Sequence, residues 1–184
     1  MMRRRDKIGW AVSRPVYLLM TVGMIFTLAL TLASARAADL SIASAAILQD
    51  LHRSNQEGMA MGRLAQQKGF TVEMRRFGDI LFYDHRSAER KVVKLAKSEG
   101  VQLGAVLSPE RPLPTGKAFD AAFAEVALAD HQKDVAAVEE AINSTTDKRL
   151  QRLLTDELSM LQKHVDIAQK ILTTQPRATT SAND

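Results

Sequence analysis

Two Asp-His pairs and one further histidine are the side chains of this sequence most suited to chemistry. The pairs are Asp84-His85 and Asp130-His131, and the further residue is His164. Each stands midway along a segment of helical periodicity, so a helix bundle would bring them to similar heights. Because imidazole and carboxylate groups bind zinc, iron, nickel and copper, these five residues are candidate ligands of a divalent transition metal. The alternative is that they satisfy one another as hydrogen-bonded cross-links between helices.

Four amphipathic segments are predicted to position these residues, at about residues 40–68, 72–99, 117–142 and 147–172. On the second segment, His85 lies near the centre of the apolar face and Asp84 lies towards its edge. On the third segment, the same periodicity places Asp130 at the centre and His131 at the periphery. We therefore expect His85 and Asp130 to point most directly into the bundle.

The first and last segments carry further polar and small residues on their apolar faces. Gly58 and Gly62 stand one turn apart on the first segment, where side chains this small let a neighbouring helix approach closely. Glu157 and His164 interrupt the apolar face of the last segment. They are two turns apart, about 10 Å along the helix axis, which is too far for both to hold one ion directly. His52 is expected at the surface or rim.

Two breaks separate the segments. Residues 100–115 contain two glycines and three prolines, which cannot sustain a helix and suit a long connection. Residues 143–145 suit a tight turn between antiparallel neighbours. No segment alternates in the manner of a strand. The sequence therefore predicts an all-α fold, a single four-helix bundle of two hairpins with a long connection between helices two and three.

The N-terminal residues 1–37 have the organisation of a signal peptide. A basic start precedes an apolar run from Val16 through Ala33, and Ala35-Arg36-Ala37 predicts cleavage before Ala38. The alternative is an uncleaved inner-membrane anchor through residues 16–35, because such a run is also long enough to cross a bilayer. In either case we expect residues 38–172 to form an exported, periplasmic bundle, with residues 173–184 as a disordered tail.

Composition excludes several classes of protein. The formal charge is +4, but residues 1–37 hold six basic residues and one acidic residue. The remainder has 25 − 6 = 19 basic and 21 − 1 = 20 acidic residues, a net charge of −1, so a nucleic-acid partner is not expected. The chain has no cysteine, which excludes disulfides, thiolate metal sites and a lipid-bearing cysteine.

The familiar catalytic motifs are also absent from the sequence. A ferritin-type di-iron centre needs two Glu-x-x-His motifs, and no glutamate of this chain has histidine three residues later. Glu57, the glutamate of the first segment, lies on the flank of its apolar face. The sequence contains no glycine-rich phosphate loop, no HExxH and no Gly-x-Ser-x-Gly. No catalytic residues are therefore predicted.

The sequence resembles an exported bacterial family, domain-of-unknown-function family 4142. The resemblance rests on four stretches: Gly62-Arg63-Leu64-Ala65, Phe77 with Tyr83-Asp84-His85, Phe119 with Ala129-Asp130-His131, and Leu158 with Leu161 and His164-Val165. It implies a ferritin-like four-helix bundle of unestablished activity. Two positions depart from the family pattern: Gly58 stands where the family commonly has glutamate, and Ser159 where it commonly has proline. Gly58 weakens the argument that this chain shares a metal site with the family. Ser159 implies that the last helix is less kinked than in the family.

These observations favour a structural, envelope or stress-related interaction module over an enzyme. An envelope protein or a second copy of the chain is the expected partner, and the membrane is contacted only through the N-terminal segment if that segment is retained. The alternative is a metal-binding or storage protein that uses the Asp-His pairs without a ferritin-type di-iron centre.

Overall fold

The computed structural model describes residues 16–107 and 111–174, with side chains described from Ile42 onward. Every regular element in these ranges is a helix: α1 (Val16–Lys68), α2 (Val72–Glu99), α3 (Lys117–Ser144) and α4 (Lys148–Thr174). The predicted all-α fold with four helices is therefore confirmed.

The chain divides into two compact units, residues 1–41 and residues 42–184. In the first unit, the described residues 16–41 form the N-terminal part of α1. Among the residues whose side chains are described, from Ile42 onward, no helix has the length and apolar character needed to cross a membrane. The predicted signal segment and its cleavage point lie outside the residues whose side chains are described. The predicted tail also lies outside them, apart from its first two residues, which still belong to α4.

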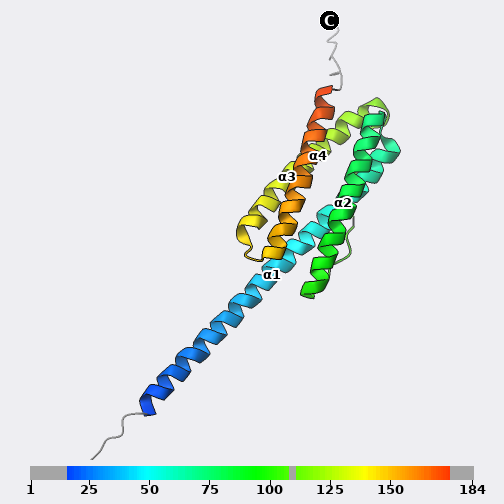
Figure 1. The fold of residues 1–184 in the computed structure, drawn as a ribbon. Coiled ribbons are helices and arrows are strands. Elements are labelled where there is room, and N and C mark those ends of the chain that lie inside the picture. Colours follow the sequence, from blue (N-terminus) through cyan, green and yellow to red (C-terminus); the bar gives the residue numbers. More distant parts are fainter. Residues whose placement is uncertain (1–15, 108–110, 175–184) are drawn as a thin grey trace, which may run out of the picture. The chain divides into compact units, whose positions relative to one another are not determined.

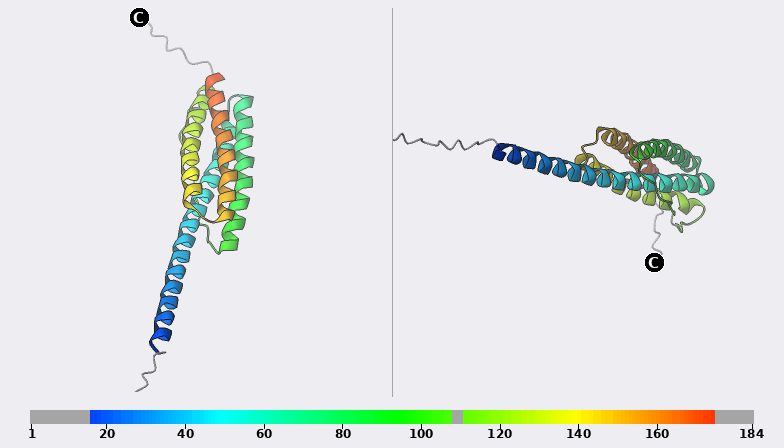
Figure 2. Two further views of the ribbon diagram at one scale, coloured as in Figure 1. Left: turned by 60° about the vertical axis from the view of Figure 1, so that its left-hand side comes forward. Right: turned by 90° about the horizontal axis from the view of Figure 1, so that it is seen from below.

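The second unit is a four-helix bundle formed by α1 from residue 42 onward together with α2, α3 and α4 (Figure 1). Figure 2 shows that α1 and α4 run in one direction and that α2 and α3 run in the other. The connection between α2 and α3, of which residues 108–110 are not described, returns the chain along the length of the bundle. This is the long connection predicted from its prolines and glycines.

The ends of α2 follow local chemistry. The Thr71 hydroxyl accepts a hydrogen bond from the backbone N–H of Met74 at 3.2 Å, which satisfies one of the free donors at the helix start. At the other end Gly100 adopts φ 71°, and its N–H bonds to carbonyls of the last turn. This left-handed backbone is readily available to glycine, so the chain leaves the helix there.

Small residues bring α1 and α2 into backbone contact, as predicted for Gly62. A Cβ atom at Gly62 would lie 2.6 Å from the Phe82 nitrogen, and one at Gly78 would lie 2.7 Å from the Gln66 nitrogen. No side chain fits at either position without moving the backbone. Gly62 and Gly78 therefore set the short distance between α1 and α2.

Two apolar clusters fill the bundle, and a polar layer separates them along the helices. One cluster gathers Phe77, Phe119 and Phe123 near the turn between α1 and α2. The other gathers leucines and valines from the opposite end of the bundle, among them Leu48, Leu51, Val92, Val138, Leu150 and Leu154. The buried polar side chains at intermediate positions of the four helices are Asn55, His85, Glu89, His131, Glu157 and His164.

Asp120 ties the turn of the first hairpin to α3. Its side chain is fully buried and accepts three hydrogen bonds, from the backbone N–H of Phe70 at 2.8 Å, the N–H of Thr71 at 2.9 Å and the Thr71 hydroxyl at 2.6 Å. A buried carboxylate with three donors is well compensated for its lost hydration. The contact therefore links two hairpins that the chain joins only through a long connection.

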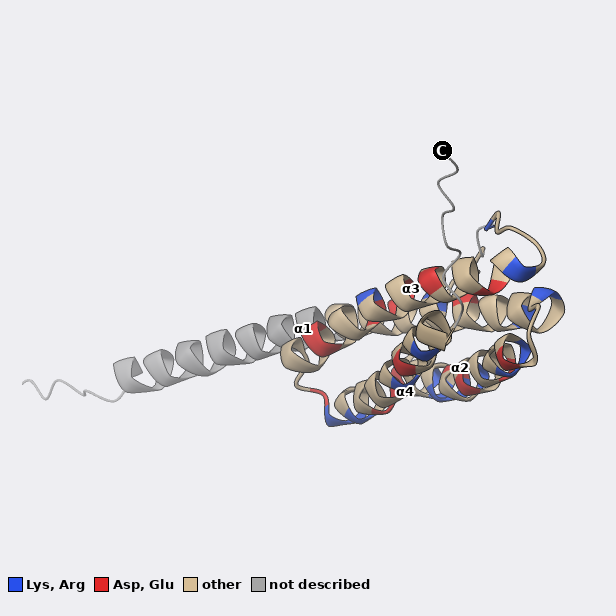
Figure 3. Cartoon of the chain, turned by 90° about the horizontal axis from the view of Figure 1, so that it is seen from above, with Lys and Arg blue, Asp and Glu red and all other residues tan. Residues whose placement is uncertain are grey.

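Basic and acidic residues are interspersed along α2 and α4 (Figure 3). Lys91 pairs with Asp156 at 2.8 Å, and Arg149 pairs with Glu99 at 2.6 Å. These exposed pairs contribute little to stability, on the order of 0–1 kcal/mol each.

Candidate metal centre

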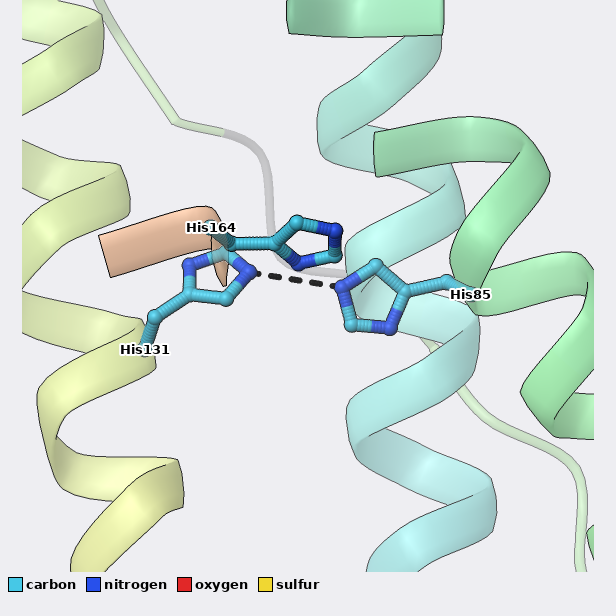
Figure 4. A group of neighbouring side chains, drawn as sticks. All are labelled: His85, His131 and His164. Atoms are coloured by element: carbon cyan, nitrogen blue, oxygen red, sulfur yellow. Dashed lines mark hydrogen bonds between the residues drawn. The ribbon is translucent and has the colours of Figure 1, made fainter. Parts of the chain in front are cut away.

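Three histidines from three helices meet in the polar layer. His85 on α2, His131 on α3 and His164 on α4 have exposed fractions of 1%, 5% and 0%. Their ring centroids are 5.0–5.6 Å apart, and one nitrogen from each ring lies within 4.8 Å of the others. Figure 4 shows the rings turned toward one another. The three candidate histidines thus form one compact group.

The partners of the outer nitrogens determine where each ring carries its hydrogen. His131 Nδ1 lies 2.7 Å from the backbone carbonyl of Ala127, which only accepts, so Nδ1 carries the hydrogen. His85 Nδ1 lies 2.9 Å from Asn55 Oδ1, and the Asn55 amide nitrogen donates to Glu157. With the Asn55 amide in this orientation, His85 Nδ1 is also a donor. In the neutral rings, both Nε2 atoms carry lone pairs.

These two lone pairs face each other. His85 Nε2 and His131 Nε2 are 3.3 Å apart, a distance at which one atom normally donates to the other. With both hydrogens turned outward, neither nitrogen has a hydrogen to donate. The contact is repulsive between neutral rings and becomes attractive when a cation lies between the nitrogens.

The third ring also donates through one nitrogen and keeps a lone pair on the other. His164 Nε2 lies 3.2 Å from Asp84 Oδ2 and donates to this carboxylate. The other nitrogen, Nδ1, is buried and has no hydrogen-bond partner among the described residues. A buried, unpaired acceptor costs roughly 1–3 kcal/mol, so its lone pair requires an explanation.

Burial keeps the three rings uncharged. The pKa of His164 is lowered to about 4 by desolvation and by the neighbouring His131. Desolvation also lowers the pKa of His131, and it lowers the pKa of His85 well below its usual range, with further contributions from His164 and His131. At neutral pH all three rings are therefore in the form that binds metals.

The two aspartates of the Asp-His pairs do not join the histidine group. Asp84 accepts from His164 and from Lys163 at 2.9 Å, so it positions a ring on α4 rather than its neighbour His85. Asp130 pairs with Arg111 at 2.6 Å and is partly exposed.

The prediction that Asp130 is central on the third helix and His131 peripheral was wrong. The buried face of α3 runs through Phe119, Phe123, Ala127, His131 and Val138. Alanines on several sides of α3 leave the apolar face poorly marked in the sequence, and this displaced the predicted face by about one residue.

Comparison with known protein families shows to which family this chain belongs. A family model described as "Domain of unknown function (DUF4142)" matches residues 29–171. The chain belongs to the DUF4142 family. No curated protein matches it. A solved structure, a conserved hypothetical protein, rv2844, from Mycobacterium tuberculosis, is similar with a TM-score of 0.64 and 13% identity, covering 74% of this chain and 95% of that chain. At this identity the likeness shows the fold alone.

In this DUF4142 chain, Gly58 has a specific role beside the histidines. A Cβ atom at position 58 would lie 2.3 Å from Cδ2 and 2.4 Å from Nε2 of His85. Small residues of the first helix were predicted to let a neighbouring helix approach closely. At Gly58 the close neighbour is the His85 side chain of α2. The His85 ring occupies the space that a larger residue at position 58 would fill.

Sequence reasoning missed Asn55 and placed His52 too far outside. Asn55 is 1% exposed and holds His85, and the available signal was its position one turn after Leu51 on the apolar face. His52 is half-buried and bonds to the Glu89 carboxylate at 2.7 Å and to the Gly104 carbonyl at 3.0 Å. Both residues belong to the polar layer around the histidine group.

Proposed function

We propose that this protein binds one transition-metal ion through His85, His131 and His164. The observation that carries the proposal is the 3.3 Å contact between two Nε2 atoms whose rings both carry their hydrogens on the opposite nitrogen. A proton or a metal ion is needed between them, and the depressed pKa values of His85 and His131 disfavour the proton.

The spacing suits a tetrahedral ion. Zinc binds imidazole nitrogen at about 2.0–2.1 Å, so two nitrogens on one tetrahedral zinc are about 3.3 Å apart. The His85–His131 pair has this separation, and the His164 nitrogen lies within 4.8 Å of the pair. Three imidazoles suit zinc, copper, nickel or iron and leave a fourth position for water or another ligand.

The surroundings support the same function. Histidine ligands of metals almost always donate their other N–H to a carboxylate, a carbonyl or a similar acceptor, which fixes the ring orientation. Here the acceptors are Asn55 Oδ1, the Ala127 carbonyl and Asp84 Oδ2. Three separate acceptors for three convergent rings favour metal binding over a purely structural cross-link, which needs at least one hydrogen between the rings.

The function is metal binding rather than iron oxidation of the ferritin type. The sequence lacks Glu-x-x-His, and Glu157 bonds to Asn55 instead of approaching the ring nitrogens. A single ion held by neutral ligands is the arrangement we propose.

We also propose that this function operates outside the cytoplasm. The support is the succession of a basic start, an apolar run and Ala35-Arg36-Ala37 in the sequence. Mass spectrometry of the exported protein should find Ala38 as its first residue. An intact N-terminus in the membrane fraction would favour the anchored alternative.

The metal is tested by equilibrium dialysis of the purified protein against Zn²⁺ or Co²⁺, followed by elemental analysis. We expect one ion per chain, and the visible bands of bound Co²⁺ should report tetrahedral coordination. The variants His85→Ala and His131→Ala should lose the ion, whereas His52→Ala, which removes a histidine outside the group, should retain it. Equal and negligible metal in all four proteins would overturn the proposal.

A further inference from the structure

Asn55 connects the histidine group to a buried carboxylate. Its Oδ1 accepts from His85 Nδ1 at 2.9 Å, and its Nδ2 donates to Glu157 Oε1 at 3.0 Å. Asn55 and Glu157 are 1% and 3% exposed, so water does not compete strongly for these bonds. Whether Glu157 accepts a hydrogen bond from Asn55 or donates one to it therefore affects the orientation of the Asn55 amide.

Glu157 in turn lines a crevice at the surface of the bundle. A crevice of about 400 Å³ between α1, α3 and α4 is lined by Glu157, Asp134, Ser54 and Glu57. Ser54 donates to Asp134 at 2.6 Å across this crevice. The crevice gives the Glu157 carboxyl group a route for exchanging its proton with water.

We infer that Glu157, through the Asn55 amide, sets which nitrogen of His85 carries the hydrogen and thereby whether the histidine group accepts an ion. The inference rests on the proposed metal-binding function. It makes Glu157 and Asn55 positioning residues, since neither one contacts the ion.

Two hydrogen-bond patterns satisfy this chain of residues. With Glu157 ionised, the carboxylate accepts from Asn55 Nδ2, Asn55 Oδ1 accepts from His85 Nδ1, and His85 Nε2 presents a lone pair. With Glu157 protonated, its hydroxyl donates to Asn55 Oδ1, the flipped amide donates to His85 Nδ1, and His85 Nε2–H donates to His131 Nε2. The second pattern removes the lone-pair repulsion without a metal and blocks the site.

Every proton is accounted for when the second hydrogen-bond pattern converts to the first. When an ion binds the protonated form, the Glu157 hydroxyl proton leaves through the crevice, the amide turns back, and the His85 hydrogen moves from Nε2 to Nδ1. The ion then bonds to the freed Nε2. One proton is released for each ion bound, in addition to any from a bound water.

The groups facing Glu157 place this exchange near neutral pH. Burial raises its pKa to about 7, although the Asn55 hydrogen bond and Lys91 on α2 act in the opposite direction. Glu89 on α2 and Asp134 on α3 add negative charge and raise it further. Glu157 is therefore ionised above this pH and protonated below it.

The first experiment compares the Zn²⁺ affinity of the wild-type protein and Glu157→Gln at pH 6 and pH 8. Glutamine is neutral at both pH values and, unlike a carboxylate, can donate to Asn55 Oδ1, so the variant should behave as protonated glutamate at both values. One pH unit above a pKa of about 7 corresponds to a tenfold excess of carboxylate. We expect the wild-type protein to bind about tenfold more tightly than the variant at pH 8 and within about twofold of it at pH 6.

Glu57→Gln is the matched control. Glu57 lines the same crevice, and among the described residues its carboxylate has no hydrogen bond to Asn55. The control should follow the wild-type protein at both pH values. If it reproduces the weakened binding of Glu157→Gln, negative charge alone explains the effect and the inference is wrong.

The second experiment needs no metal. Nitrogen-15 NMR of the metal-free wild-type protein should show the His85 hydrogen on Nε2 at pH 6 and on Nδ1 at pH 8, and on Nε2 at both values in Glu157→Gln. The same His85 tautomer at both pH values in the wild-type protein would overturn the inference even if the variant failed to fold. Absence of Zn²⁺ binding by the wild-type protein would instead reject the proposed function. The NMR result alone would then show whether Glu157 sets the His85 tautomer.

Discussion

A Cβ atom at Gly58 would lie 2.3 Å from Cδ2 of His85, so the absence of a side chain on α1 gives the imidazole on α2 its position. Real Cβ atoms do not approach other atoms this closely. The His85 ring is held on its other side by the bond from Nδ1 to Asn55. Position 58 is therefore coupled to the metal centre without contributing a ligand.

Gly58→Ala should displace His85 from the group. Alanine favours the helix by up to ~1 kcal/mol, but overpacking costs typically 1–3 kcal/mol, so we expect a small net loss of stability. The loss of metal should be much larger, because His85 can no longer face His131. Gly104→Ala is the control, since a Cβ atom there would meet only Gln49 Oε1, at 3.8 Å. Full metal binding by Gly58→Ala would contradict the role assigned to this glycine.

The two aspartates of the Asp-His pairs should differ in their effect on metal binding. Asp84→Ala removes the acceptor that orients His164, and loss of such a partner typically weakens metal affinity 10–100-fold. Asp130→Ala breaks only the ion pair with Arg111 and should leave affinity within about twofold of the wild-type value. Titration with Zn²⁺ compares them directly. A similar loss in both variants would show that the effect comes from net charge.

Glu157→Gln should stabilise the metal-free protein at alkaline pH. The pKa of Glu157 is raised from 4.5 to about 7, so its contribution to stability is present below pH 4.5 and is lost as pH rises through 7. Removing the charge should increase the free energy of unfolding by about 3 kcal/mol at pH 8 and by about 1 kcal/mol at pH 5. Urea denaturation in the presence of a chelator measures both values. An equal gain at the two pH values would exclude titration of Glu157 as the cause.

The histidine group should destabilise the metal-free protein in acid. The pKa of His164 is lowered from 6.5 to about 4, so the unfolded chain takes up a proton first and stability present above pH 6.5 is lost as pH falls towards 4. The Glu157→Gln background is the one to use, because the Glu157 contribution has the opposite sign. There we expect the free energy of unfolding to fall by about 2 kcal/mol between pH 8 and pH 5. Adding His164→Gln should remove the part of this dependence that comes from His164 and leave the part that comes from His85 and His131.

Asp120 should prove more important for stability than any surface charge of the bundle. Asp120→Ala leaves two backbone N–H groups and one hydroxyl without their partner, which we expect to cost about 3 kcal/mol. Asp120→Asn keeps one acceptor oxygen and should lose less. Urea denaturation beside Asp156→Ala, which removes an exposed ion pair, provides the comparison. A loss below about 0.5 kcal/mol for Asp120→Ala would contradict the assignment.

The fold was predictable because its signals are local. Helical periodicity marks the four helices, Thr71 and Gly100 mark two helix ends, and prolines mark the long connection. The arrangement inside the polar layer was not predictable in this way, because its contacts join residues on different helices. Adjacent residues on a helix point about 100° apart, so Asp84 cannot serve His85, and its partner on α4 is 80 residues away.

Other features of the site had weak signals or none. The alanine-rich α3 concealed that His131 faces inward, and an asparagine on α1 gave no indication of its buried partner. The hydrogen positions that make the histidine group suited to a metal follow only from the partners of each nitrogen. Those partners come from several helices, and no spacing in the sequence specifies them.

No two of the three histidines share a helix, and this has a kinetic consequence for a loaded protein. An ion at the centre would close loops of 46 residues between α2 and α3 and of 33 residues between α3 and α4. Neither hairpin could separate from the other without breaking a bond between nitrogen and metal. The loaded bundle would therefore open more slowly than the metal-free bundle.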